Sequence, residues 1–235
     1  MEGKVAFVAG ATGLTGRFVV EELRRRGART VAHVRPDSSS LDAWRARFRA
    51  MGAEVDTTPW DEAAMLRTLR ELAPDVVFAL LGTTRARDKR ARKQGSDSSY
   101  EAVDYGMTSL LRRACERCGS RPRFVYLSAV GVSDASGNPY YQVRARIERE
   151  LRDGPLSYVV ARPSFILGER DESRPGETIG AGVGDTLLGI AGALGATRLR
   201  DRYRSIRAED LARALVRLAF DPAADRTTIE PSGLR

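Results

Sequence analysis

The chain has 235 residues, of which 42% are hydrophobic, and it carries a formal net charge of +8. This length is enough for one α/β domain with a large core, so folding does not depend on disulfides or a structural metal. No apolar run reaches the roughly 18 residues that cross a bilayer, and the N-terminus enters a strand-like run at once, which leaves no room for a signal peptide. We therefore expect a cytoplasmic protein with no membrane partner.

Strand-like and helix-like segments alternate along the chain. Apolar runs of strand length lie at 4–10, 30–35, 54–57, 75–81, 123–128, 157–162 and, as a short last strand, 228–230. Segments with helical spacing of apolar residues lie at 17–26, 42–51, 61–72, 100–118, 140–151, 185–194 and 209–220. A segment rich in glycine and charge, 168–184, is expected to be a loop.

This alternation predicts a parallel sheet with helices on both faces. The fourth strand, 75–81, is apolar almost throughout, as expected of a strand buried on both faces. We expect one Rossmann-type α/β domain over residues 1–235, a doubly wound parallel sheet in three layers. Residues from about 163 to 235 are expected to contribute a small C-terminal lobe on the substrate side.

The first strand leads into a glycine-rich loop, Gly10–Gly16, with glycines three residues apart. The first glycine allows a sharp turn, the second lets the backbone approach a pyrophosphate, and the third lets the following helix pack close to the sheet. The start of that helix offers free N–H groups and a positive dipole end. Its position between a strand and an amphipathic helix supports a dinucleotide site. The residues expected to bind the pyrophosphate are Gly10, Thr12, Gly13, Leu14, Thr15 and Gly16.

The choice between NADP(H) and NAD(H) depends on the residue that ends the second strand. Arg35 stands there, where an acidic residue would bind the ribose hydroxyls of NAD(H) and repel a 2′-phosphate. Arginine does the reverse, so we expect NADP(H), although Asp37 lies two residues further on. Asp56, at the third strand, is expected either to accept from the adenine amino group or simply to hold a turn.

Further along the sheet, the end of the fourth strand is expected to pass under the cofactor. The residues concerned are Leu81, Gly82 and Thr83.

Other features of the sequence favour structural roles. Cys115 and Cys118 are spaced C-x-x-C late in a helical pattern, without a second Cys or His pair, so we read them as reduced thiols and expect no metal site. His33 is the only histidine and is expected to be packed inside the second strand, which excludes a Ser-His-Asp triad. The basic run 85–93 has no interleaved aromatic residue, so it favours a solvated surface over nucleic acid.

The motifs resemble the short-chain dehydrogenase/reductase superfamily, in its atypical NAD(P)H-binding (NmrA-like) branch, and within it the Tat-interacting oxidoreductase-like proteins most of all. The resemblance rests on local matches in the same order along nearly the whole chain. The matching segments are Gly10–Gly16, Leu81–Arg85, Val103–Asp104, Leu127–Ser128, Tyr140–Arg144, Arg162–Pro163 and Glu172–Glu177.

The resemblance also implies a set of catalytic residues. In this superfamily a Tyr exchanges a proton with the substrate oxygen, a Lys four residues later binds the nicotinamide ribose, and a nearby Ser polarises the oxygen. Tyr140 has the required spacing, but Arg144 stands where the lysine is expected; it keeps the charge without the compact geometry. Ser128 is the expected polarising hydroxyl; its alternative role is to hydrogen-bond the backbone at the end of a strand. The alternative role of Tyr140 is that of an aromatic residue in the turn that caps the helix.

Two functions follow from the resemblance. The first is an oxidoreductase that transfers hydride between NADP(H) and a small carbonyl or alcohol substrate, with Tyr140, Arg144 and Ser128 as its catalytic residues. The second is a catalytically weak or inactive NADP(H)-binding sensor or regulatory module that acts through a protein partner, which the change from Lys to Arg144 favours.

Overall fold

The computed structural model describes residues 1–82, 100–168 and 204–235. Its centre is a seven-stranded sheet in the order β3-β2-β1-β4-β5-β6-β9, with every neighbouring pair parallel. The strands of this sheet are β1 (Val5–Ala9), β2 (Arg29–His33), β3 (Glu54–Asp56), β4 (Val76–Ala79), β5 (Arg123–Leu127), β6 (Tyr158–Ala161) and β9 (Thr227–Ile229).

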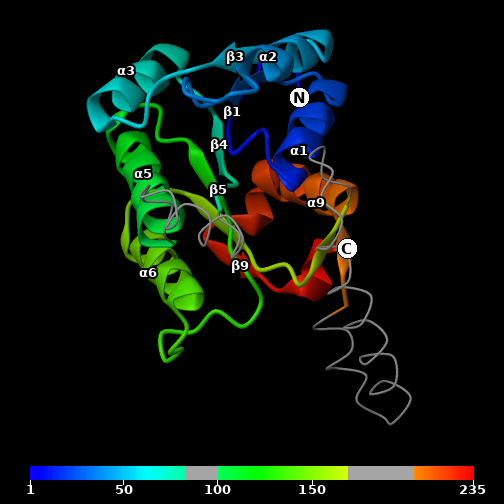
Figure 1. Cartoon of the computed structure of the whole chain (residues 1–235). Helices are drawn as coiled ribbons and strands as arrows, with labels where there is room; N and C mark the ends of the chain where they lie inside the picture. Colours follow the sequence, from blue (N-terminus) through cyan, green and yellow to red (C-terminus); the bar gives the residue numbers. More distant parts are fainter. Residues whose placement is uncertain (83–99, 169–203) are drawn as a thin grey trace.

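Helices cover both faces of this sheet (Figure 1). The α-helices are α1 (Leu14–Arg25), α2 (Leu41–Ala50), α3 (Glu62–Leu72), α5 (Thr108–Arg117), α6 (Pro139–Asp153) and α9 (Ala208–Phe220). A π-helical turn, η1 (Tyr100–Met107), runs directly into α5. Two 3₁₀ turns, η2 (Pro222–Ala224) and η3 (Pro231–Leu234), flank β9.

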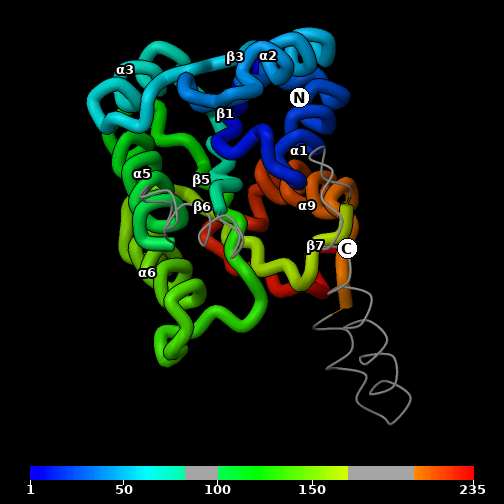
Figure 2. Tube along the Cα trace, in the orientation of Figure 1, coloured from blue at the N-terminus to red at the C-terminus, as the bar shows by residue number. Residues whose placement is uncertain are grey.

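Each strand sends alternate side chains into two hydrophobic clusters, one on each face. In β1, Val8 joins the cluster formed with α1, α2 and α9, whereas Phe7 joins the cluster formed with α3, α5 and α6. Helices α1 and α9, far apart in the sequence, lie side by side (Figure 2). The predicted three-layer, doubly wound Rossmann fold is therefore confirmed.

The sheet reverses its winding between β1 and β4. The chain passes from β1 outward to β2 and β3, and then returns to place β4 on the other side of β1. In open parallel sheets, ligands bind outside the carboxyl ends of the strands at such a reversal. The fold thus places the glycine-rich loop, which follows β1, at the expected binding edge.

The described residues of the segment 163–235 form part of the main body and a small separate sheet. Helix α9 packs against α1, and β9 extends the main sheet beside β6, so both belong to the three-layer body. Only β7 (Ile166–Leu167) and β8 (Ile206–Arg207) form a small sheet of their own within the described part of this segment. Residues 169–203 of the expected lobe lie outside the described residues, so its extent stays a prediction. The helix expected at 185–194 lies outside the described residues.

Both cysteines lie inside the protein. Cys115 and Cys118 are both buried, and the Cys118 thiol donates to the Cys115 carbonyl, so both side chains are part of the core. Across residues 1–82, 100–168 and 204–235, the helices are all too short or too polar to cross a membrane.

Arg123 joins the sheet to the end of α9, and its removal is expected to destabilise the protein. Its Nη1 donates to the carbonyl oxygens of Leu218, Ala219 and Asp221, at 3.4, 3.3 and 2.6 Å. Losing these charged hydrogen bonds in Arg123→Met should lower the free energy of unfolding by about 2 kcal/mol, measured by urea denaturation. Arg213→Gln removes an exposed arginine paired within α9 and should cost less than about 1 kcal/mol. Equal losses in the two variants would contradict this role of Arg123.

Candidate functional site

The glycine-rich loop is shaped by contacts that leave no room for side chains. Gly10 has a φ of +81°, and a Cβ there would overlap the Leu80 carbonyl oxygen just after β4. A Cβ on Gly16 would overlap the Gly10 carbonyl oxygen, and one on Gly13 would lie 3.1 Å from it. The loop closes through a hydrogen bond from the Gly13 amide to that same oxygen, at 2.9 Å. Gly10 and Gly16 are thus required by backbone packing at the carboxyl ends of β1 and β4, and Gly13 avoids a tight contact with the same carbonyl.

The loop presents its second glycine and the start of α1 to the outside. Thr12 and Gly13 are exposed, whereas Thr15 and Gly16 are buried behind them. Gly13 is the N-cap of α1, no side chain caps the helix, and its first turn holds no acidic residue. The first N–H groups of α1 therefore have no acceptor within the helix, and they form the positive end of the helix dipole. Leu14 instead points its side chain toward Gly168, after β7.

At the end of β2, Arg35 lies on the surface where the adenosine ribose is expected. Its side chain is 53% exposed and pairs loosely with Asp37, at 3.5 Å. Asp56 lies nearby at the end of β3, but its carboxylate accepts from the backbone amide and the hydroxyl of Thr58. Arg35 is therefore available to an anion, whereas Asp56 holds a turn, the alternative role considered for it.

A second cluster lies where Gly82 follows β4. Arg144, on α6, is buried and forms an ion pair with buried Asp104 of η1, with 2.7 Å between Nη1 and Oδ1. Its guanidinium lies over the Tyr140 ring, 3.9 Å from the ring centroid. A Cβ on Gly82 would lie 3.4 Å from Arg144 Nη2. The structure thus brings together Tyr140, Arg144 and Gly82, and adds Asp104, which the sequence had marked only as part of a matching segment.

Tyr140 is held at the start of α6 by the local sequence. Asn138 caps the helix by accepting from the Tyr140 amide at 3.0 Å, and Pro139 occupies the first helical position. The Tyr140 ring also packs edge-on against Tyr100 and Tyr141. Burial raises the pKa of the Tyr140 hydroxyl above its usual range, and Arg144 partly offsets the rise. The hydroxyl is therefore protonated at neutral pH.

Ser128 is engaged differently from the expected oxygen ligand. It is buried after β5, and its hydroxyl donates to Oε1 of Glu148 at 2.5 Å. Arg162 donates to the same carboxylate and to Glu230, which follows β9. The hydroxyl expected to polarise a substrate is therefore committed to a carboxylate on α6. Glu148 follows Arg144 by one helical turn, so the i, i+4, i+8 spacing from Tyr140 was the only signal for it in the sequence.

Several predicted features fall where the structure gives no description. Leu81 and Gly82 are described, and Leu81 packs against the cluster under α3, α5 and α6. Thr83, the basic run 85–93 and the matching segment Glu172–Glu177 lie outside the described residues, as does all but the first residue of the loop 168–184.

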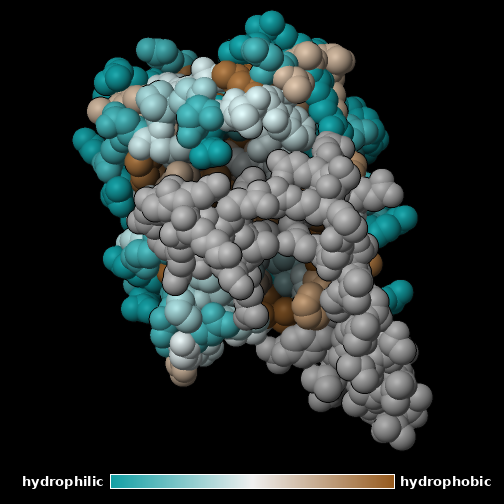
Figure 3. Space-filling model, viewed as in Figure 1, coloured by the Kyte–Doolittle hydropathy of each residue, from teal (hydrophilic) through white to brown (hydrophobic). Residues whose placement is uncertain are grey.

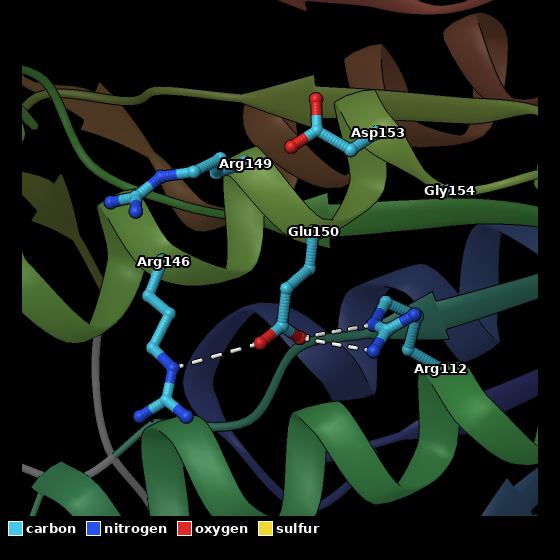
Figure 4. A pocket seen from close by; sticks show the side chains of 6 residues that line it. All are labelled: Arg112, Arg146, Arg149, Glu150, Asp153 and Gly154. Carbon is cyan, nitrogen blue, oxygen red and sulfur yellow. Dashed lines mark hydrogen bonds and ion pairs between the residues drawn. The ribbon is translucent and has the colours of Figure 1, made fainter.

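A polar hollow between α5 and α6 is a separate feature. Figure 4 shows Glu150 between Arg146 and Arg112, whose guanidinium nitrogens lie 3.6 and 3.1 Å from its carboxylate. Arg149, also at the hollow, pairs with Asp134 at 2.5 Å. These guanidinium groups have carboxylate partners, which compensate part of the positive charge of the hollow. It also lies further along α6 than Tyr140 and Arg144.

On the face drawn in Figure 3, the described residues are mostly hydrophilic, with a few apolar residues among them. Phe165, just before β7, is the large apolar side chain that is most exposed in the described part of the chain, at 53%. It lies between the end of β6 and β7, on the side of the sheet where the strands end.

Comparison with known proteins agrees with this geometry. Residues 10–222 match the model of a family described as NAD(P)H-binding. Protein HTATIP2 of Rattus norvegicus is 31% identical over 186 residues, 75% of this chain and 69% of that protein. Protein FMP52, mitochondrial, of Coccidioides immitis is 28% identical over 219 residues, 89% of this chain and 82% of that protein. The resemblance to NAD(P)H-binding proteins of the Tat-interacting type is confirmed.

Solved structures agree on the fold. A short-chain dehydrogenase/reductase from Serratia marcescens superposes with a TM-score of 0.66 at 17% identity, covering 98% of both chains. A UDP-glucose-4-epimerase from Stenotrophomonas maltophila, solved with bound NAD and formylated UDP-arabinopyranose, also gives 0.66, at 18% identity, covering 96% of this chain and 76% of that one.

The prediction of a cytoplasmic location is wrong. Relatives from Aspergillus terreus, Coccidioides immitis and Aspergillus fumigatus are named mitochondrial proteins. The prediction rested on the lack of a long apolar run and on a strand close to the N-terminus. Neither feature distinguishes one aqueous compartment from another.

The buried histidine beside the Arg35 surface predicts a loss of stability in mild acid. His33 is 3% exposed, its Nε2 donates to the Thr58 carbonyl at 2.8 Å, and burial lowers its pKa below 6.5. As the pH falls through about 6.5, the unfolded chain binds a proton that the folded chain does not. The free energy of unfolding should therefore have its full value above that pH and should decrease as the pH falls from 7 to 5.

Urea denaturation at a series of pH values measures this decline, at about 1.4 kcal/mol for each unit that separates the two pKa values. His33→Gln removes the titrating group and serves as the control, so its curve should be flatter over this range. The same slope in both proteins would show that His33 is not responsible.

Proposed function

The chain belongs to the NAD(P)H-binding family, and we propose that it binds NADP(H) and transfers hydride between this cofactor and a small carbonyl or alcohol substrate. The observation that carries the proposal is the backbone cradle at the reversal of the sheet, where side chains are excluded and helix amides are uncapped. A pyrophosphate fits such a place, because it needs close backbone approach and N–H donors.

The residues around the cradle fit the two ends of the cofactor. Arg35 would bind the 2′-phosphate, since its only described partner, Asp37, is 72% exposed and such surface pairs are weak. Arg144 would bind the nicotinamide ribose beside Gly82. Its Nε is buried without a hydrogen-bond partner among the described residues, and a ribose hydroxyl would satisfy this donor.

Bound NADP(H) would supply or accept the hydride, and the Tyr140 hydroxyl would donate or accept the proton. A raised pKa keeps its hydroxyl protonated at neutral pH, which suits proton donation to a carbonyl oxygen as its carbon is reduced. Arg144, stacked on the ring, would stabilise the tyrosinate that remains. Ser128 has no part in this step, because its hydroxyl is held by Glu148.

A second candidate function rests on the same cluster. Arg144 is paired with Asp104 and stacked on Tyr140, and Ser128 is engaged with Glu148. A site whose polar side chains are already paired with one another favours tight cofactor binding over turnover. In this alternative, the protein senses NADP(H) and signals through a protein partner.

Reversing the charge of Arg35 should change the preference between cofactors. Arg35→Glu replaces an attractive charge at the 2′-phosphate by a repulsive one, so NADPH should bind at least about tenfold more weakly. NADH, which lacks this phosphate, should bind with unchanged or higher affinity. Fluorescence titration with each nucleotide measures both affinities, and Arg213→Glu is the control for net charge. Unchanged NADPH affinity in Arg35→Glu would contradict the assignment.

Removing the Tyr140 hydroxyl separates the two functions. If the protein turns over, Tyr140→Phe should lower kcat with NADPH and a panel of aldehydes and ketones by roughly 10²–10⁴. Tyr141→Phe, the neighbouring tyrosine on α6, should leave kcat within about twofold. Tight NADPH binding without turnover in the wild-type protein would favour the sensor, and turnover unaffected by Tyr140→Phe would exclude Tyr140 as proton donor.

A further inference from the structure

The ion pair between Asp104 and Arg144 is costly to bury. The Asp104 residue is 1% exposed and Arg144 is 5% exposed, so both charges have left water almost completely. Desolvation of two charges commonly exceeds their mutual attraction, and a hydrophobic pair of similar size is often as stable. Stability alone therefore does not account for these two residues at the carboxyl end of β4.

The two partners come from elements that meet at the proposed nicotinamide end of the site. Asp104 lies in η1, a π-helical turn, and π turns inside helices are frequent at functional sites. Arg144 comes from α6, the third element after η1 along the chain. Its guanidinium has the Tyr140 ring on one side and the backbone of Gly82 near Nη2. Asp104 contacts Nη1, whereas Tyr140 lies against the face of the guanidinium and Gly82 lies near Nη2.

We propose that Asp104 is a positioning residue for the proposed hydride transfer, because it holds the plane of the Arg144 guanidinium between Tyr140 and the nicotinamide ribose. This inference rests on the proposed function. A lysine presents a compact point charge and needs no fixed plane, whereas the planar fork of an arginine binds only in the correct orientation. The exchange of Lys for Arg144 thus creates the need for a buried carboxylate, and Asp104 meets it.

The charges around Tyr140 give the pairing a second consequence. On α6 the Tyr140 hydroxyl is influenced by Arg144 and Tyr141, and from η1 by Asp104 and Tyr100. Tyr126 of β5 also lies within their electrostatic reach. Burial is the main reason for the raised pKa of Tyr140, and the Asp104 carboxylate raises it further. Neutralising Asp104 should therefore shift the pH profile of reduction toward lower pH.

Two ligands separate the nicotinamide end from the rest of the site. NADPH occupies the whole proposed site, whereas adenosine 2′,5′-bisphosphate reaches only the end at Arg35. Asp104→Asn should weaken the binding of NADPH by about tenfold, which corresponds to the loss of roughly one charged hydrogen bond. The affinity for the bisphosphate should be unchanged. In an Arg144→Gln background the same substitution should have no further effect, because Asp104 acts through Arg144. Glu101→Gln removes an exposed acid of the same turn and is the matched control.

Isothermal titration of the full-length variants with both ligands gives a distinct result for each failure. Wild-type protein that binds neither ligand would contradict the proposed function itself. If the wild-type protein binds both ligands, three results would overturn the positioning role alone. These are that Asp104→Asn loses no affinity, that it loses equal affinity for both ligands, or that it loses as much NADPH affinity in the Arg144→Gln background as in the wild type. If Asp104→Asn does not fold, Asp104→Glu decides, because it keeps Arg144 and the buried negative charge but moves the carboxylate. A selective loss of NADPH supports the proposal, and wild-type affinity for both ligands overturns it.

Discussion

The close approach of two backbones at the carboxyl ends of β1 and β4 is the constraint on which the rest of the site depends. Gly10 lies so near the Leu80 carbonyl that no side chain fits between them, and Gly16 is as close to the Gly10 carbonyl. Only glycine allows the chain to turn from β1 into α1 at this point. The packing that closes the fold therefore also leaves bare amides at the edge where parallel sheets bind ligands.

The second half of the site depends on how α6 is set against the sheet. Tyr140, Arg144 and Glu148 follow one another by single turns, and the first two contact η1 whereas the third contacts residues after two strands of the sheet. Tyr140 packs on Tyr100 of η1, Arg144 pairs with Asp104, and Glu148 accepts from residues that follow β5 and β6. Because these contacts are polar or stacked, they fix the rotation of the helix more specifically than the apolar contacts of Ile147 and Leu151.

The sequence predicted the fold well because periodicity and glycine spacing are local signals. The alternation of strands and helices, the loop Gly10–Gly16 and the buried His33 were all confirmed. Partners remote in the chain were not predictable: nothing local indicates that Ser128 donates to Glu148, 20 residues away, or that Asp104 pairs with Arg144. The docking of α9 on α1 and of β9 on β6 was not predictable for the same reason, since it depends on tertiary packing.

Amide hydrogen exchange of the purified protein, with and without NADPH, tests the central claim most directly. If the bare amides of the cradle hold a diphosphate, peptides that cover Gly10–Gly16 should exchange more slowly when NADPH is added. Peptides that cover the hollow between α5 and α6 should be unchanged. Unaltered exchange at Gly10–Gly16 under saturating NADPH, or protection confined to another part of the chain, would contradict the account.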